Sequence, residues 1–145
     1  MFQERSAIIL LVEDNAGDII LVEEALDSAG INCTLRVSTS GEDALNYVSN
    51  RPPYETAERP DLILLDLNLP GKNGFDVLQE LKGDAKLKSI PVIVLTTSTA
   101  ESDIKTSYEL HANCYISKPL DFNQFTDIVG VIQKFWFDVA KLPNN

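Results

Sequence analysis

The chain has 145 residues, of which 44% are hydrophobic and 23% charged, a composition typical of one globular domain spanning residues 1–145. Twelve basic against 22 acidic side chains give a formal net charge of −10, which argues against nucleic acid as a direct partner. The apolar stretches are too short for a membrane span or a secretory leader, so we expect no membrane contact and a cytoplasmic location.

Five short apolar segments alternate with five helix-like segments along the chain. The predicted strands are residues 7–12, 33–37, 62–66, 92–96 and 114–116. This alternation is typical of an α/β fold in which a doubly wound parallel sheet is covered by helices on both faces. The segment 62–66 is almost wholly apolar and is followed by a Pro70-Gly71 turn, which favours a central strand that ends at Asp66.

The helix-like segments have recognisable ends. The first is predicted to stop at Gly30, a residue that suits the left-handed conformation of a helix cap. The later helices have candidate capping residues at their starts, which are Ser40, Asn73, Ser98 and Asp121. The fifth helix, from about residue 121, is predicted to be long, and its aromatic end, Phe135-Trp136-Phe137, is expected to lie in the core, at an interface or in both.

Two further features carry no site of their own. Residues 50–60 form a polar, proline-containing segment, longer than a usual connection, that we expect on the surface. Cys33 and Cys114 match neither a metal-ligand spacing nor a disulfide framework, and we expect both to be buried thiols.

Charged and hydroxyl side chains stand where the predicted strands end. Glu13 and Asp14 follow the first strand, Asp66 ends the third, Thr96 ends the fourth, and Lys118 lies just beyond the fifth. If the first and third strands are neighbours, about 4.8 Å apart, their carboxylates lie within several ångströms of one another. Two such charges about 4 Å apart repel by roughly 4 kcal/mol at an effective dielectric near 20, so the cluster needs a cation.

The residue types at these strand ends suit phosphoryl chemistry. Carboxylate oxygens are hard ligands that favour Mg²⁺, for which Mn²⁺ can substitute. The Lys118 ammonium would neutralise one oxygen of an arriving phosphoryl group, and the Thr96 hydroxyl would donate to another. The sequence therefore predicts a phosphoryl acceptor site in which an aspartate is the nucleophile.

Over nearly its whole length the chain resembles the receiver domains of two-component response regulators. The motifs that carry this resemblance, in the family's order and spacing, are Val12-Glu13-Asp14-Asn15, Leu65-Asp66-Leu67-Asn68-Leu69-Pro70 with Gly74, Leu95-Thr96, and Tyr115-Ile116-Ser117-Lys118-Pro119. The resemblance implies a flavodoxin-like fold with a five-stranded parallel sheet in the order 2-1-3-4-5. In that order Cys33 and Cys114 lie at opposite edges of the sheet, too far apart for a disulfide.

The resemblance also implies a metal site around the phosphoacceptor. Asp66 is then the residue that is phosphorylated, and Glu13 and Asp14 are the acidic pair that holds the metal with it. The backbone carbonyl of Asn68 is a further ligand. Glu13 reaches the metal either directly or through a water molecule.

Three residues are implied to respond to the phosphoryl group. Lys118 contacts it, Thr96 follows it on activation, and Tyr115 is the aromatic switch that turns inward, unless Tyr115 is simply an aromatic residue of the edge strand. The Lys118–Pro119 bond is expected to be cis. His111 stands alone in the sequence, and a lone histidine is more often structural than catalytic.

The chain is also similar to a narrower group, the small response regulators that partner cyanobacterial phytochromes and related sensor kinases. This similarity rests on the proline-containing segment, on Leu110-His111-Ala112-Asn113-Cys114-Tyr115-Ile116, and on the Phe135-Trp136 tail with Leu142-Pro143. It implies a stand-alone receiver in a phosphorelay, with a sensor histidine kinase such as a phytochrome upstream and a protein target downstream. We also expect a homodimer through the fourth helix, fifth strand and fifth helix.

The alternatives are a Mg²⁺-dependent phosphatase with an aspartate nucleophile, a receiver-like module used only for docking, and a flavodoxin-like cofactor binder. The phosphatase is disfavoured because Asn68 stands where such enzymes place a second acid. The intact set of acids, threonine and lysine argues against a docking-only module. No phosphate-binding glycine-rich loop follows the first strand, which disfavours the cofactor binder.

Overall fold

Strands and helices alternate along the whole of the computed structural model, which describes residues 6–30 and 32–143. The strands are β1 (Ala7–Val12), β2 (Cys33–Ser38), β3 (Leu62–Leu65), β4 (Val92–Thr96) and β5 (Cys114–Ser117). The helices are α1 (Ala16–Ala29), α2 (Gly41–Val48), α3 (Gly74–Gly83), α4 (Glu101–Glu109) and α5 (Phe122–Lys134), and a short π-helix (Phe135–Val139) continues α5. None of these helices has the length and apolar character that a membrane crossing requires.

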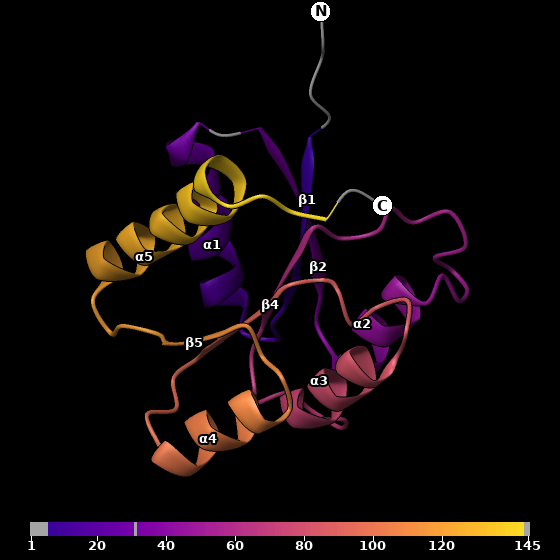
Figure 1. The fold of residues 1–145 in the computed structure, drawn as a ribbon. Helices are drawn as coiled ribbons and strands as arrows, with labels where there is room; N and C mark the ends of the chain where they lie inside the picture. Colours follow the sequence, from indigo (N-terminus) through magenta and orange to yellow (C-terminus); the bar gives the residue numbers. More distant parts are fainter. Residues whose placement is uncertain (1–5, 31, 144–145) are drawn as a thin grey trace, which may run out of the picture.

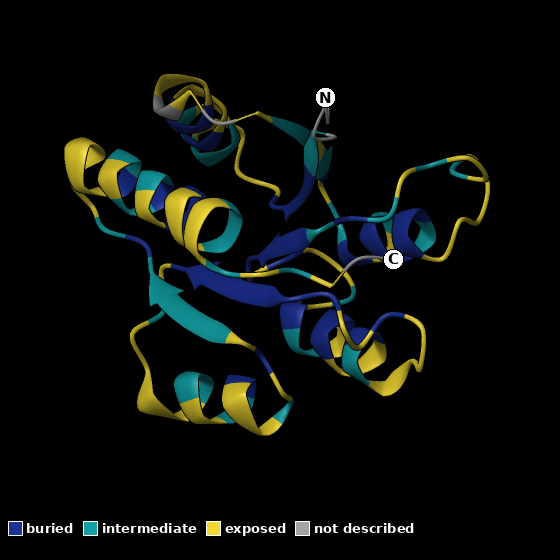
Figure 2. Ribbon diagram, turned by 45° about the horizontal axis from the view of Figure 1, so that its top comes forward, coloured by how far each residue is buried: buried dark blue, intermediate teal, exposed yellow. Residues whose placement is uncertain are grey.

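The five strands form one parallel sheet in the order β2-β1-β3-β4-β5, so the predicted order is confirmed. Helices α1 and α5 cover one face of the sheet, while α2, α3 and α4 cover the other (Figure 1). Strand residues alternate between two apolar cores: Leu10 of β1 packs with α2 and α3, whereas Ile9 packs with α1 and α5. The central strands are buried and β5 is half-buried (Figure 2).

The predicted strand boundaries hold to within one residue. The bounds of β1 and β4 are as expected, β2 and β5 each run one residue further, and β3 ends at Leu65 instead of Asp66. The Asp66 N–H still donates to the Val12 carbonyl at 3.0 Å, and the backbone N–H of Asn68 then turns back to donate to the Asp66 side chain at 3.2 Å. Asp66 therefore lies in the turn that leaves the central strand.

Most of the predicted helix ends are also confirmed. Gly30 ends α1 with a φ of 71°, and the side chains of Ser40, Asn73 and Asp121 each accept a backbone N–H at the start of their helices. The prediction for Ser98 is wrong, since α4 begins at Glu101 after Ala100, which makes no side-chain cap. The Ser98 hydroxyl instead donates to the Asp103 carboxylate at 2.6 Å.

Residues 50–60 are a surface connection, as expected, and side-chain hydrogen bonds order it. The Asn50 amide donates to the carbonyls of Tyr54 and Ala57 at 3.0 and 2.9 Å. The Tyr54 hydroxyl donates to the Asp43 carboxylate at 2.7 Å, and its ring lies 5.2 Å from that of Tyr47. This connection is therefore fixed against α2.

The cysteines and the aromatic C-terminal segment only partly match expectation. Cys33 on β2 and Cys114 on β5 are free and lie at opposite edges of the sheet, but both are half-buried, because edge strands are covered less than central ones. Trp136 and Phe137 pack against the core beneath α1 and α5. Phe135 is 49% exposed and lies edge-on to Trp136, so this segment contributes to both the core and the surface.

One backbone N–H of the edge strand β5 is hydrogen-bonded to a side chain of the neighbouring helix α4. The N–H of Tyr115 donates to the hydroxyl of Tyr108 in α4 at 3.1 Å. The ring of Tyr108 is 48% exposed. The phenol therefore stands at the surface beside β5 and occupies one of its backbone donors.

Candidate functional site

Three acidic side chains meet where β1 and β3 end. These strands are neighbours in the sheet, with Val12 opposite Leu65, so the residues that follow them emerge at the same edge. One carboxylate oxygen from each of Glu13, Asp14 and Asp66 lies within 4.8 Å of the other two. Glu13 and Asp66 are buried and Asp14 is exposed, so the cluster is open to solvent on one side.

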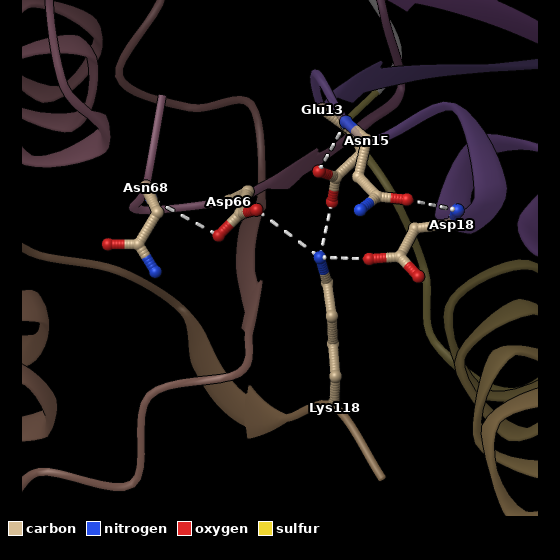
Figure 3. Close-up of polar contacts among 6 residues, drawn as sticks. All are labelled: Glu13, Asn15, Asp18, Asp66, Asn68 and Lys118. Carbon is tan, nitrogen blue, oxygen red and sulfur yellow. Dashed lines mark hydrogen bonds and ion pairs between the residues drawn. The ribbon is translucent and has the colours of Figure 1, made fainter. Parts of the chain in front are cut away.

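Lys118 reaches this cluster from the loop after β5. Its ammonium donates to Glu13 Oε2, to Asp18 Oδ2 at 2.9 Å and to Asp66 Oδ2 at 3.2 Å (Figure 3). The side chain is only 4% exposed, and burial alone would lower the pKa of Lys118. The contacts with Glu13 and Asp18 outweigh burial and raise that pKa above its ordinary value, so Lys118 stays charged.

Glu13 has the least solvent of the clustered acids. Its carboxylate is 2% exposed, and burial raises the pKa of Glu13 to about 7 despite the opposing effect of Lys118. The nearby Asp66 carboxylate acts in the same direction as burial. The backbone N–H of Asn15 donates to Glu13 Oε1 at 3.1 Å. Several carboxylates thus share one ammonium, and the site is short of positive charge.

Thr96 ends β4, the strand next to β3, and Tyr115 lies on the edge strand β5. Thr96 is fully buried, and its hydroxyl has no hydrogen-bond partner among the described residues. The Tyr115 hydroxyl donates to the backbone carbonyl of Ser98 at 3.0 Å, and the Ser117 hydroxyl donates to the same carbonyl at 3.0 Å. The loop after β4 is therefore fastened to β5 by two side chains.

The turn after Asp66 is held close to α3 by a glycine. A Cβ atom added at Gly74 would lie 2.5 Å from the Asp66 carbonyl oxygen and 2.6 Å from Leu67 Cα, closer than real contacts allow. The backbone N–H of Gly74 donates to the carbonyl of Leu67 at 3.0 Å. Asn68, in the same turn, is exposed and contacts Asp66 through its backbone N–H. The close approach at Gly74 therefore fixes the backbone of the Asp66 turn.

The sequence did not predict a role for Asp18. This residue stands in the first turn of α1, where an acid three residues after an asparagine is expected to act only in capping. The available signal was its place just after β1, since the helix that follows a parallel strand starts at the same edge as the site. His111 lies in the turn before β5, at the opposite end of that strand from Lys118.

The expected cis bond between Lys118 and Pro119 is wrong. The one cis peptide bond in the described residues joins Pro52 and Pro53. The trans form is the intrinsically favoured isomer of a bond before proline. With this bond trans, the backbone N–H of Lys118 donates to the carbonyl of Thr96 at 2.6 Å and the ammonium reaches all three of its carboxylates.

The donor set of the cluster fits a divalent cation. Carboxylate oxygens are hard ligands of the kind that Mg²⁺, Mn²⁺ and Ca²⁺ prefer. Glu13, Asp14 and Asp66 supply three such oxygens close together, and a cation would offset the repulsion that the single ammonium of Lys118 leaves. The exposed side of Asp14 leaves room for water or for an anionic ligand.

A parallel α/β domain that brings a buried aspartate, a lysine and an acidic cluster together at one edge of its sheet has the architecture of a phosphoacceptor signalling domain. The sequence model of the response regulator receiver domain matches residues 9–130. The chain therefore belongs to the response regulator receiver family, as its sequence motifs predicted.

Similar proteins and solved structures support this assignment. Response regulator Rcp1 of Synechocystis sp. (strain ATCC 27184 / PCC 6803 / Kazusa) is 45% identical over 136 residues, covering 94% of this chain and 92% of Rcp1. The crystal structure of the phosphorylated cyanobacterial phytochrome response regulator RcpA is 47% identical with a TM-score of 0.94, covering 97% and 100% of the two chains. The Mn²⁺-bound form of Rcp1 is 44% identical with a TM-score of 0.91, covering 95% and 99%.

Proposed function

We propose that the protein is a response regulator that accepts a phosphoryl group on Asp66 from a sensor histidine kinase. A carboxylate oxygen of Asp66 attacks phosphorus, the new O–P bond forms, and the bond from phosphorus to the donor breaks. Water later attacks the same phosphorus, which releases inorganic phosphate and restores the carboxylate. These two steps on its own aspartate are the only chemistry that the proposal requires.

The observation that carries this proposal is the surroundings of Asp66. Lys118 contacts one of its carboxylate oxygens and the backbone N–H of Asn68 contacts the other, so the carboxylate is held in one orientation. The buried Thr96 hydroxyl has no partner in the described chain, which is costly unless a ligand supplies an acceptor. A phosphoryl oxygen would satisfy it.

We propose Mg²⁺ as the cation of this site. Glu13, Asp14 and Asp66 would hold it through their carboxylates, with the backbone carbonyl of Asn68 as a further ligand. When bound, the cation neutralises charge that develops on the transferring phosphoryl group. The fit of the oxygen cluster supports this assignment, as does the Mn²⁺-bound form of the similar protein Rcp1.

The proposed output is a change in the surface formed by α4, β5 and α5. The Thr96 hydroxyl would move toward the phosphoryl group, and Tyr115 would follow. The Tyr115 contact with the Ser98 carbonyl supports this coupling, because it joins β5 to the loop that begins just after Thr96. The changed surface would bind a downstream protein target.

We further propose that the protein acts in the cytoplasm, with a sensor kinase of the phytochrome type upstream. The phytochrome response regulator RcpA, 47% identical with a TM-score of 0.94, supports a kinase of this type. The similarity to Rcp1 at 45% identity points the same way.

The decisive experiment is phosphorylation with radiolabelled acetyl phosphate in the presence of Mg²⁺. We expect label on the wild-type protein and on Asp76→Asn, a control at an exposed capping residue, and none on Asp66→Asn. Undiminished labelling of Asp66→Asn would disprove the assignment of the acceptor. Sustained multiple turnover of a phosphate ester would indicate a phosphatase instead.

A homodimer through α4, β5 and α5, with the π-helical extension contributing, is the remaining part of the proposal. The exposed apolar residues of this region, among them Val131, Phe135 and Val139, support it. Light scattering with and without beryllofluoride, a mimic of the phosphoryl group, is the measurement. Only monomer under both conditions would remove the dimer from the proposal.

A further inference from the structure

Helices α1 and α3 begin with the same spacing of residues, but their acidic side chains act differently. Each has an asparagine cap followed three residues later by an aspartate: Asn15 and Asp18 in α1, Asn73 and Asp76 in α3. In α3 the Asp76 carboxylate accepts the backbone N–H of Asn73 at 3.3 Å, which completes a capping box. In α1 the backbone N–H of Asn15 donates to Glu13 instead, at 3.1 Å. The Asp18 carboxylate is thereby left free for another contact.

That other contact is with Lys118. The Asp18 carboxylate lies 2.9 Å from the ammonium, on the side away from Asp66 (Figure 3). The Asp18 side chain is 25% exposed, whereas the Lys118 side chain is 4% exposed. Asp18 therefore connects the buried ammonium of Lys118 to the solvent-facing start of α1.

An ammonium has three hydrogens to donate, and those of Lys118 are all engaged. They go to Glu13, Asp18 and Asp66. The contact with Asp66, at 3.2 Å, is longer than the contact with Asp18, at 2.9 Å. A phosphoryl group attached to Asp66 adds further anionic oxygens close to this ammonium. For Lys118 to turn toward them, one of its present contacts must weaken.

The contact that can weaken most easily is the one with Asp18. The Glu13 carboxylate is 2% exposed, so releasing it would leave a buried charge with no water and only the backbone N–H of Asn15 as a donor. The Asp18 carboxylate can be hydrated when it is released, because a quarter of its side chain already faces solvent. Asp18 is thus the exchangeable partner of Lys118.

We propose that Asp18 is a positioning residue that competes with the phosphoryl group on Asp66 for Lys118. The inference rests on the proposed role of Asp66 as phosphoacceptor. Without a phosphoryl group, Asp18 holds the ammonium between Glu13 and Asp66. When a phosphoryl group is present, part of the attraction between that group and Lys118 is used to displace Asp18. The phosphorylated state is therefore less stable than it would be without Asp18.

Equilibrium binding of beryllofluoride in saturating Mg²⁺, measured by calorimetry, tests this competition. Asp18→Asn keeps the size of the side chain and removes its charge, and we expect it to bind beryllofluoride roughly fivefold more tightly than the wild type, the value of a partly exposed ion pair. Asp18→Glu restores a carboxylate and is expected to restore the wild-type affinity. Equal or weaker binding by Asp18→Asn would overturn the inference.

Two controls separate competition from other causes. Asp76→Asn makes the same change in the matching motif of α3, away from Lys118, and its affinity should equal that of the wild type. In a Lys118→Met background, the gain from Asp18→Asn should disappear, because the effect acts through the lysine. A gain that persists there would assign the effect to direct repulsion of the anion and overturn the role through Lys118.

Labelling with acetyl phosphate distinguishes failure of this inference from failure of the proposed function. If the wild type accepts label on Asp66 and Asp18→Asn shows no gain in beryllofluoride affinity, only the competition is wrong. If the wild type accepts no label, the role of Asp66 fails and the competition fails with it.

Discussion

Lys82 and Lys118 each donate three hydrogen bonds, but to opposite kinds of acceptor. The Lys82 ammonium donates to the backbone carbonyls of Lys88 and Ile90 and to the Asn113 side chain, at 2.9–3.0 Å. All three of its acceptors are neutral, and burial lowers the pKa of Lys82. All three acceptors of Lys118 are carboxylates, and its pKa is raised.

The difference separates a structural lysine from the lysine that we propose contacts the phosphoryl group. Two backbone carbonyls and one side-chain amide, all neutral, hold Lys82 in one arrangement, which ties the end of α3 to the start of β4 and to the residue before β5. The carboxylates around Lys118 outnumber it, so an incoming anion can exchange with one of them while the lysine remains paired. The nature of the acceptors, and not the number of contacts, distinguishes the functional site.

Removal of Lys118 is expected to have the largest effect on phosphorylation. We expect Lys118→Met to slow phosphorylation by acetyl phosphate about 100-fold, the usual cost of losing one group that stabilises developing negative charge. Initial rates of label incorporation, with Asp66→Asn as the floor, are the measurement. Phosphorylation within a few-fold of wild type would show that Lys118, like Lys82, is only structural.

The matched change at the other lysine should have the opposite outcome. Lys82→Met removes three hydrogen bonds from a charged donor, and we expect the free energy of unfolding to fall by about 2 kcal/mol. Urea unfolding followed by circular dichroism measures this loss. The phosphorylation rate should stay within twofold of wild type, and a large fall in that rate without loss of stability would contradict the distinction.

A smaller effect is expected on the pH dependence of Mg²⁺ binding. It arises from Glu13, a buried carboxyl that has no counterpart around Lys82. Because the pKa of Glu13 is raised to about 7, this carboxyl holds a proton below pH 7 that a cation must displace. Mg²⁺ affinity should therefore fall as the pH falls, by about tenfold between pH 8 and pH 6. Calorimetry at the two pH values measures the change. Glu13→Gln should bind Mg²⁺ weakly with little pH dependence, and an unchanged dependence would assign it to another group.

Much of the fold and the principal site could be predicted from the sequence. The apolar segments fixed the strands, and strands that run parallel bring Glu13, Asp14, Asp66 and Lys118 to one edge whatever the details of packing. These predictions succeeded because they depend on the period of the pattern and on the direction of the strands.

What could not be predicted depends on which partner a polar side chain meets in three dimensions. Asp18 and Asp76 follow the same local pattern, and only the position of Glu13 beside the backbone N–H of Asn15 leaves Asp18 free to contact Lys118. Ser98 has the local signature of a cap, but its hydroxyl donates to Asp103 and α4 starts later. Local propensity cannot decide between such partners.

The Tyr108 hydroxyl that accepts the Tyr115 N–H has a consequence for how this protein meets others. An open strand edge offers its backbone groups as a template on which any extended chain can add a further strand, and such growth is a route to aggregation. The phenol occupies one of these groups on β5, next to the surface proposed to carry the signal. An extended chain that approached β5 at this position would find the backbone donor already taken and would have to contact side chains, which differ between partners, instead.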